Sequence, residues 1–471
     1  MLRDMKTFIC AGVGLAAMAA GAAEWRKSVS ITDSDFWGTV PTTAATAETE
    51  MTIDFTKTDQ TFVGFGTAIS ELSWDALAVL SETDRKAVLD EMFLANGAGF
   101  TIIRTPIGSS DFSRDYYSYN DNAGDLEMKK FSLEIDERAL LPLLREIKAR
   151  VKPEDFLVWG SPWCPPRWMK TSGHYASIPP WASDNPTNDC PYEDSVFIGE
   201  DAFICDQKHF AAYAKYFRLY VDAMKEKGFP LWMVMPQNEP CSAQPYPSCT
   251  WRGRSLAEFT VDYLGPALAG SGTELYMGTI EERSIEKVRD VLDRTNGRKY
   301  VTGAGFQWEG RCAIGAIHRR YPDLTLVMTE HECNAGKNDR AELFHSWNVA
   351  RTFLGQGASY YNYWNLALTD DQRSRWGWPQ NSLVTVDRKT RKVTYNREYY
   401  LMKMLSTYIR KGATRLLTRG DLNELAFRNA DGTAAVLFAN DSAQPKIIAV
   451  KIDGRKYTCN LLPFSISAFS E

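Results

Sequence analysis

The strongest constraint on the fold is a series of eight short apolar runs between residues 61 and 365. The runs cover residues 61–70, 100–108, 156–163, 231–240, 274–280, 299–308, 324–332 and 359–365. Helical patterns lie between them, for example over residues 82–94 and 207–227. Strands that alternate with helices form a parallel sheet, and eight such units close into a barrel. The sequence therefore predicts an α/β protein with a (β/α)8 barrel over residues 61–411.

The pattern changes after Gly412. From residue 413 to the end, short alternating runs are separated by turn residues such as Asp453-Gly454, which is typical of antiparallel strands. Residues 412–471 are therefore predicted to form a C-terminal β-sandwich. Residues 24–60 contain one alternating run, 51–55, and we expect this N-terminal segment to contribute to the sandwich instead of the barrel.

Residues 1–23 have the composition of a secretory signal peptide: basic residues, a short apolar core, and small residues from Ala19 to Ala23. We expect export to the periplasm or the medium. No apolar run is long enough to span a bilayer, so no stable membrane insertion is expected.

Eight cysteines lie beyond residue 23, and an even number in an exported protein permits disulfides. Cys241–Cys249 and Cys190–Cys205 are the predicted pairs because each closes a short loop, with unpaired thiols the alternative.

Two of the predicted strands end in carboxylates. Residues 231–240 finish in Asn238-Glu239-Pro240, and residues 324–332 finish in Glu330-His331-Glu332. Active sites of (β/α)8 barrels lie at the C-terminal ends of the strands. Burial of Glu239 beneath Trp and Pro would raise its pKa, which suits a general acid; a helix-capping role is the alternative. Two such strand ends together are what a two-carboxylate glycosidase requires.

The composition restricts the class of ligand that the chain is expected to bind. The net charge of −5 gives no basic field that would hold nucleic acid. The chain has 14 Trp, 21 Tyr and 23 Phe; aromatic faces suit the stacking of sugar rings, although most of these residues must fill the core. With 5 His and no CxxC spacing, neither a metal site nor a cofactor is expected. Asp111 follows the second run and suits equally a sugar-binding role or an Asx-turn.

In their order, the motifs resemble glycoside hydrolase family 30, which comprises retaining glucosylceramidases and β-1,6-glucanases. The matching segments are Gly64-Phe-Gly-Thr-Ala-Ile69, Ser161-Pro-Trp163, Trp168-Met-Lys170, Asn238-Glu-Pro240, Thr329-Glu330 and Tyr363-Trp-Asn-Leu-Ala-Leu368. The resemblance covers nearly all of the chain beyond residue 23. It implies a barrel with a side β-sandwich, Glu239 as the acid/base and Glu330 as the nucleophile. It also implies that Asp111, Trp163, Asn238 and Trp364 line the sugar site, with Asn238 bonded to the sugar 2-OH and Trp364 as an apolar floor.

The end of the sixth run departs from the animal glucosylceramidases, which carry a His and a second aromatic residue beside the Trp at this place. Here Gln307 and Glu309 flank Trp308, which we expect to bind substrate. The change disfavours a ceramide leaving group and favours a polar, saccharide one. Glu332 shares the strand face of Glu330; the family position favours Glu330 as nucleophile, with Glu332 as a supporting group or salt-bridge partner.

The sequence thus predicts a retaining β-glycoside hydrolase of the glucosylceramidase type that acts on β-glucosides by double displacement. An endo-β-1,6-glucanase of the same family is the first alternative. A non-catalytic carbohydrate-binding protein with the same barrel is the second. The expected partner is a β-linked glucoside or glucan, in carbohydrate or sphingolipid metabolism. Product size separates the two enzymes, and any release of reducing sugar separates both from the binding protein.

Overall fold

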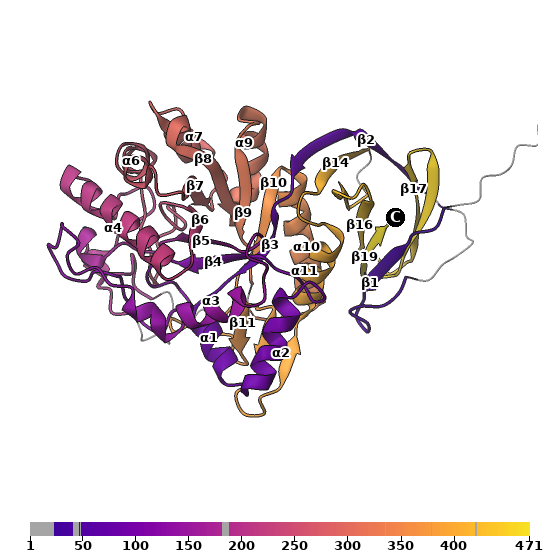
Figure 1. Ribbon diagram of the computed structural model, residues 1–471, viewed down its shortest axis with the longest axis horizontal. Coiled ribbons are helices and arrows are strands. Elements are labelled where there is room, and N and C mark those ends of the chain that lie inside the picture. Colours follow the sequence, from indigo (N-terminus) through magenta and orange to yellow (C-terminus); the bar gives the residue numbers. More distant parts are fainter. Residues whose placement is uncertain are drawn as a thin grey trace, which may run out of the picture.

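The computed structural model describes residues 23–40, 47, 49–180, 188–334, 336–377, 379–419 and 422–471. These residues form a closed eight-stranded barrel and, beside it, a second eight-stranded sheet near the C-terminus (Figure 1). The expected signal peptide, residues 1–23, lies outside the described residues except for Ala23 and stays a prediction. In the described part of the chain, no helix has both the length and the apolar character needed to cross a membrane.

The barrel is parallel and contains one strand for each predicted run, which confirms the predicted fold class. Its strands are β3 (Gly64–Ala68), β4 (Ile102–Pro106), β5 (Leu157–Ser161), β6 (Leu231–Val234), β7 (Glu274–Ile280), β8 (Val301–Gln307), β9 (Thr325–Glu330) and β10 (Ala358–Tyr363). They are paired in the order β10-β3-β4-β5-β6-β7-β8-β9. Their C-terminal ends therefore meet at one mouth, where a (β/α)8 barrel places its functional groups.

Helices lie between the strands and cover the outside of the barrel (Figure 1). The α-helices are α1 (Glu71–Ala78), α2 (Glu82–Phe93), α3 (Leu140–Lys148), α4 (Gln207–Glu226), α5 (Gly253–Glu258), α6 (Gly265–Leu268), α7 (Glu286–Leu292), α8 (Gly297–Tyr300), α9 (Ile314–Arg320), α10 (Arg340–Gly355) and α11 (Arg397–Tyr408). Short 3-10 turns occupy Glu134–Arg138, Arg167–Met169, Tyr192–Asp194 and Trp308–Cys312, and a π-helical turn occupies Phe259–Leu264. Asp206 and Asp339 cap α4 and α10, since each carboxylate accepts a bond from a backbone N–H in the first turn.

An apolar plug fills the barrel interior. It is formed by Ile102, Trp159, Met233, Met235, Tyr276, Val327 and Tyr360. Side chains two residues apart on a strand point to the same face, so the next inward residue lies one layer nearer the mouth. On β4 that residue is Arg104, whose guanidinium lies 5.0 Å from the ring centre of Trp159. A polar layer thus begins directly above the plug.

The second sheet gathers strands from both ends of the chain. Its members are β1 (Lys27–Ile31), β2 (Thr49–Thr61), β14 (Thr414–Arg419), β15 (Glu424–Arg428), β16 (Ala434–Asn440), β17 (Lys446–Ile452), β18 (Arg455–Leu461) and β19 (Ser465–Ser470). They are paired in the order β1-β19-β16-β15-β14-β2-β17-β18. The long strand β2 arches away from the barrel and pairs with β14 on one edge and β17 on the other (Figure 1). The sheet curls around β2, so that β18 contacts β16 and β19 across a separate apolar core.

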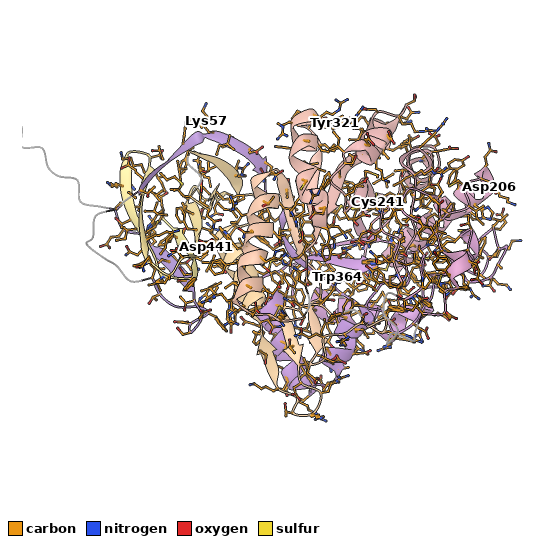
Figure 2. All side chains as sticks on the ribbon, turned by 180° about the vertical axis from the view of Figure 1, so that it is seen from behind. Lys57, Asp206, Cys241, Tyr321, Trp364 and Asp441 are labelled. Carbon is orange, nitrogen blue, oxygen red and sulfur yellow. The ribbon has the colours of Figure 1, made fainter. Side chains whose placement is uncertain are left out.

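A small third sheet was not predicted. It consists of β11 (Ala367–Thr369), β12 (Val384–Val386) and β13 (Val393–Tyr395), which follow the last barrel strand. Strands of three residues are too short to show an alternating pattern, which is why the sequence gives no sign of them. Figure 2 shows Trp364, which begins the connection from β10 to this sheet, near the middle of the molecule between Asp441 and Asp206.

The predicted disulfides are wrong. All eight cysteines beyond residue 23 are free thiols, including Cys190, Cys205, Cys241 and Cys249. The loops that the two bonds would close are held by other contacts: in the 190–205 loop, Val196 N–H donates to the Ser177 carbonyl at 2.8 Å, and in the 241–249 loop, the Ser248 carbonyl accepts a bond from a lysine. The buried Lys170 ammonium donates to the carbonyls of Tyr175, Ala176 and Ser248 at 3.0, 3.1 and 2.8 Å. Spacing along the chain predicts a short loop, but the geometry of the two Cβ atoms decides whether a bond forms.

Candidate active site

A pocket of about 260 Å³ opens at the mouth of the barrel. It is lined by Asp111, Trp163, Asn238, Glu239, Ser242, Gln244, Tyr246, Glu281, Trp308, Glu330 and Gln380. Six of the seven predicted site residues are in this set; Trp364 is not. Three larger clefts, of about 830, 650 and 320 Å³, lie along the second sheet, beside the end of α11, and between α10 and β14. None of the three contains a predicted site residue.

The ends of five barrel strands supply the predicted residues. Glu330 is the last residue of β9, and Trp308 directly follows β8. Trp163 lies two residues beyond β5, and Glu239 and Asp111 each lie five residues beyond β6 and β4. The polar residues at the ends of these buried strands therefore lie together at the mouth of the barrel, although they are far apart in sequence.

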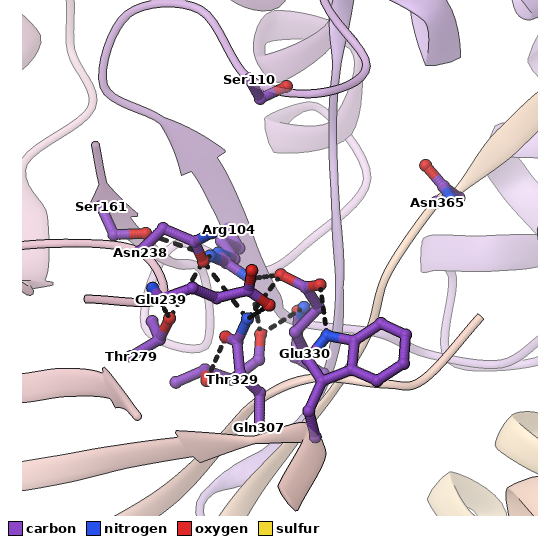
Figure 3. Close-up of polar contacts among 12 residues, drawn as sticks. Arg104, Ser110, Ser161, Asn238, Glu239, Thr279, Gln307, Thr329, Glu330 and Asn365 are labelled. Carbon is purple, nitrogen blue, oxygen red and sulfur yellow. Dashed lines mark hydrogen bonds and ion pairs between the residues drawn. The ribbon is translucent and has the colours of Figure 1, made fainter. Parts of the chain in front are cut away.

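One side-chain amide lies between the two predicted catalytic carboxylates (Figure 3). Gln307 Nε2 donates to Glu239 Oε1 at 3.0 Å and to Glu330 Oε2 at 3.1 Å. These two oxygens are therefore at most 6.1 Å apart, the sum of the two distances. Gln307 Oε1 accepts a bond from Thr329 Oγ1 at 2.9 Å, which fixes the amide with its donor toward the carboxylates.

Three donors hold the Glu330 carboxylate. Arg104 Nη1 donates to Oε2 at 2.6 Å, and Trp308 Nε1 donates to Oε1 at 3.2 Å, in addition to the bond from Gln307. The Arg104 side chain is fully buried, and its guanidinium lies 4.5 Å from the ring centre of Trp163. A buried, fixed positive charge beside Glu330 suits a carboxylate that must act as an anion.

Asn238 is oriented by the same network. Its Oδ1 accepts bonds from Arg104 Nη2 at 2.6 Å, Thr279 Oγ1 at 2.9 Å and Gln307 Nε2 at 3.3 Å (Figure 3). The amide nitrogen consequently points away from these donors, and no described residue accepts a bond from it. Its N–H groups remain available to a substrate oxygen at the edge of the pocket.

Glu239 lies in surroundings that favour its protonated form. Burial raises its pKa well above the ordinary value, the charges of Glu330 and Glu281 raise it further, and the bond from Gln307 lowers it. Burial and the charge of Glu330 likewise raise the pKa of Asp111, whose Oδ1 has no hydrogen-bond partner among the described residues. A protonated acid thus lies next to a carboxylate that is held by donors.

The backbone is strained at two pocket residues. Glu239 has φ of 50° and Trp308 has φ of 47°, both in the left-handed region. That conformation costs a residue with a side chain about 1–2 kcal/mol, and it is found where the surrounding structure needs a particular side-chain direction. At Trp308 it accompanies the indole N–H bond to Glu330.

Trp364 lies one layer below the pocket. It is 1% exposed, and its ring stacks on that of Trp163 with centres 5.2 Å apart. Its ring also faces the Arg104 guanidinium at 5.4 Å. In this structure it supports the wall that Trp163 presents, and a direct contact between Trp364 and a sugar stays a prediction.

Glu332 belongs to a different set of contacts. Its carboxylate pairs with Arg311 and, at 3.2 Å, with His345, and it is not among the described residues that line the pocket. Burial raises its pKa, but the bond from His345 and the charge of Arg311 outweigh burial and bring the pKa below its ordinary value. The geometry of Glu332 is that of an ion-pair partner.

Sequence reasoning did not single out Arg104 and Glu281, although each left a sign. Arg104 is a charged residue inside an apolar strand, which a buried strand accommodates only when the charge is paired. Glu281 directly follows β7 and so repeats the pattern of an apolar run that ends in a carboxylate. The sequence marked Gln307 only as a difference from the animal glucosylceramidases. Its bonds to both carboxylates depend on which barrel strands are neighbours, and the sequence does not show that.

The site contains no cluster suited to a metal. Within the described ranges, no group of three or more His, Cys, Asp or Glu side chains is placed to hold a metal ion. The chemistry that the arrangement supports is proton transfer by Glu239 and nucleophilic attack by Glu330, with Asn238 and Asp111 as hydrogen-bonding groups.

Comparison with known proteins agrees with this geometry. Residues 62–374 match the family described as the glycosyl hydrolase family 30 TIM-barrel domain. A lysosomal acid glucosylceramidase of Mus musculus is 25% identical over 423 residues, which cover 84% of this chain and 78% of that protein. The endo-1,6-β-D-glucanase BGN16.3 of Trichoderma harzianum is 27% identical over 410 residues, with 81% and 78% covered. The solved structure of the endo-β-1,6-glucanase BT3312 has a TM-score of 0.78 and 26% identity, over 94% of this chain and 98% of that one.

Proposed function

The chain belongs to glycosyl hydrolase family 30 and is a β-glycoside hydrolase, and from this premise we propose that it cleaves β-1,6-linked glucan with retention of configuration. In this proposal Glu330 is the nucleophile and Glu239 the acid/base. The observation that carries retention is the Gln307 amide, which bonds to both carboxylates and keeps two of their oxygens within 6.1 Å of each other. Retaining enzymes have carboxyl groups about 5–5.5 Å apart, and inverting enzymes about 6.5–9.5 Å.

The reaction proceeds in two displacements. Glu330 Oε attacks the anomeric carbon while Glu239 gives its proton to the departing glycosidic oxygen. Glu239, now ionised, removes a proton from water, and the water oxygen displaces Glu330 from the sugar. The Asn238 N–H groups bond to the sugar 2-OH, a contact that strengthens in the transition state. The first displacement leaves Glu239 ionised and Glu330 bound to the sugar, and the second returns both carboxyl groups to their starting state.

The lining of the pocket supports a saccharide leaving group. Eight of its described residues are polar or charged, three are aromatic, and none is aliphatic. At the end of β8, Glu309 forms ion pairs with Arg283 and Arg311, both at 2.6 Å. A ceramide needs an apolar surface for its chains, whereas a sugar needs hydrogen-bonding partners. Glucosylceramide remains the second candidate because of the similarity to the mouse glucosylceramidase over most of both chains.

The deciding experiment offers three substrates to the purified protein: β-1,6-linked glucan, glucosylceramide in mixed micelles, and an aryl β-glucoside. We expect shortened oligomers from the glucan, with the β-anomer as the first product by NMR. Turnover of glucosylceramide without glucan cleavage would replace the proposal by the second candidate. An α-anomer as first product would refute retention, and no reducing sugar from any substrate would indicate a binding protein.

We also propose that the protein is exported. The support is the sequence of residues 1–23, with its basic start, apolar core and small residues before Glu24. The test is the N-terminal sequence of the protein isolated from the cells and from the medium of its native host. Mature protein that begins near residue 24 outside the cytoplasm is expected, and full-length protein confined to the cytoplasm would refute export.

A further inference from the structure

A fourth carboxyl group, Glu281, lines the same pocket as Asp111, Glu239 and Glu330 and has no role in the reaction described above. Its Oε1 accepts bonds from the backbone N–H of Cys241 at 2.6 Å and from Ser242 Oγ at 3.1 Å. Its Oε2 is buried and has no hydrogen-bond partner among the described residues. The residue as a whole is 9% exposed. A buried carboxyl oxygen without a partner is costly, and a bound donor would remove that cost.

The barrel order shows which part of a substrate meets Glu281. Three of the expected sugar-binding groups, Asp111, Trp163 and Trp364, follow β4, β5 and β10, which lie around β3. β7, which carries Glu281, lies four positions from β3 in the barrel. Asn238 and Trp308 follow β6 and β8, the neighbours of β7. Glu281 therefore lies across the barrel from Asp111 and Trp364, on the side of the acid Glu239.

The residues that follow Glu239 in the chain lie on the same side of the pocket as Glu281. The residues that Glu281 bonds, Cys241 and Ser242, directly follow Glu239-Pro240. Ser242 and Gln244 line the pocket beside Glu281. An acid that protonates the departing oxygen stands next to the leaving group, so these residues form the wall that the leaving group meets.

We infer that Glu281 is a specificity-determining residue whose carboxyl group hydrogen-bonds a hydroxyl of a saccharide leaving group. This inference rests on the proposed function, because it assigns Glu239 as the acid. It goes further by naming the residue that distinguishes a sugar from an alkyl or lipid alcohol. Burial raises the pKa of Glu281 to about 7, so both of its protonation states are populated near neutral pH. The ionised form accepts a bond from a hydroxyl, and the protonated form donates one.

The test compares two substrates whose leaving groups are both primary alcohols. One is a β-1,6-linked glucose disaccharide, and the other is hexyl β-glucoside. Both need a proton from Glu239, since neither alcohol leaves readily as an anion, but only the disaccharide has hydroxyls on its leaving group. Any effect of Glu281 on the acidity of Glu239 or on its loop therefore acts on both substrates, whereas a contact with the leaving group acts on one.

For Glu281→Ala we expect kcat/KM for the disaccharide to fall about 10- to 100-fold, the effect of losing a hydrogen bond to a charged group. For hexyl β-glucoside we expect a smaller loss, because its leaving group has no hydroxyl for Glu281 to bond and only the effects on Glu239 and its loop remain. Glu281→Gln keeps an acceptor for Cys241 N–H and a polar group at the Oε2 position, so its loss on the disaccharide should be smaller. Glu282→Gln, the same change at the neighbouring residue outside the pocket lining, is the matched control and should leave both rates unchanged.

Equal losses of Glu281→Ala on both substrates, or no loss on the disaccharide, would overturn the inference. So would a Glu281→Gln variant as poor as Glu281→Ala on both. If the wild type cleaves only β-1,3- or β-1,4-linked disaccharides, the proposed glucan fails, and the same comparison on the cleaved disaccharide decides the role of Glu281. If the wild type cleaves alkyl or lipid glucosides but neither a disaccharide nor the β-1,6-glucan, both the proposed function and the inference fall; if it cleaves the glucan but no disaccharide, the glucan takes the place of the disaccharide in the same comparison.

Discussion

Removal of the Gln307 amide is the sharpest test of the catalytic geometry. Gln307→Leu keeps the approximate volume of the side chain and deletes its bonds to Glu239, Glu330 and Asn238. The Glu330 carboxylate would retain the bonds from Arg104 and Trp308. The substitution therefore changes the relation between the two carboxylates without releasing the nucleophile from the barrel.

The expected cost follows from the bond to Glu330. A hydrogen bond to a charged group contributes about 1.5–3 kcal/mol, and the nucleophile needs that alignment when it attacks. We expect kcat/KM for a β-linked substrate to fall about 10- to 150-fold, at the rate of tenfold per about 1.4 kcal/mol. Thr329→Val is the matched control, because it keeps the three bonds from Gln307 Nε2 and removes the one that anchors Gln307 Oε1, together with the contact of Thr329 Oγ1 to the Phe306 carbonyl at 3.1 Å. A neutral bond contributes about 0.5–1.5 kcal/mol, so its loss should be about 2- to 10-fold.

The same substitution should move the pH profile in a defined direction. The Gln307 N–H stabilises ionised Glu239 and so lowers its pKa against the effect of burial. Without that bond the pKa of Glu239 rises. Because Glu239 must be protonated to act as acid, the alkaline limb of kcat/KM moves to higher pH while the maximum falls.

The assay is the pH dependence of kcat/KM for wild type, Gln307→Leu and Thr329→Val, with unfolding temperatures to show that the variants are folded. An alkaline limb that moves to lower pH would refute the assignment of Glu239 as the acid. A value of kcat/KM within about 2-fold of wild type at the optimum would refute the positioning role of Gln307.

Three further predictions concern single carboxyl groups. Glu330→Gln should lower kcat by about 10⁴-fold or more on every substrate, as loss of a catalytic nucleophile does; substantial turnover would reassign the nucleophile. Glu239→Gln should still form the glycosyl-enzyme from dinitrophenyl β-glucoside, seen as a burst of phenol, while β-1,6-glucan cleavage is lost; equal losses on both would contradict the acid role. Asp136 is buried beside the hydroxyls of Tyr117 and Tyr119, and burial raises its pKa to about 7. The folded protein then keeps a proton that the unfolded chain loses above its ordinary pKa of 3.8, so this residue's contribution to stability declines as pH rises from about 4 to 7. Asp136→Asn should therefore stabilise the fold relative to wild type more at pH 8 than at pH 5, by about 3 kcal/mol in the free energy of unfolding, for about two pH units between pH 5 and the raised pKa. The same difference at both pH values would contradict this reasoning.

The barrel was predictable from sequence because its strands are buried on both faces and so form apolar runs. The runs identify where strands begin better than where they end. The run over residues 231–240 is more than twice as long as β6, which has 4 residues and ends at Val234. Pro236 has no N–H to continue the ladder, and the chain turns so that Asn238 and Glu239 enter the pocket. Polar residues at the end of a run thus belong to the site more than to the strand.

The contacts among side chains were not predictable in the same way. Gln307 bonds to residues 69, 68 and 23 positions away, and no local pattern specifies which strands are neighbours in the barrel. Arg104 contacts Glu330 from 226 positions away. The disulfide prediction failed for a related reason, since loop length gives no information on the direction of the two thiols.

The order of strands in the barrel assigns two properties of the site, the separation of the two carboxylates and the choice of leaving group, to different strand ends. Glu239 follows β6 and Glu330 ends β9, with β7 and β8 between them on the barrel wall. Neighbouring strands are about 4.8 Å apart, so the wall from β6 to β9 spans about 14 Å, and inward-pointing side chains close that gap. The separation of the two carboxylates is thus set by barrel curvature, by Gln307 from β8, and by the turn after β6 that carries Glu239. The end of β7 carries Glu281, which lies beside the acid and away from the sugar-binding wall. Changes at that strand end should alter which leaving group is accepted while the two-carboxylate geometry is kept.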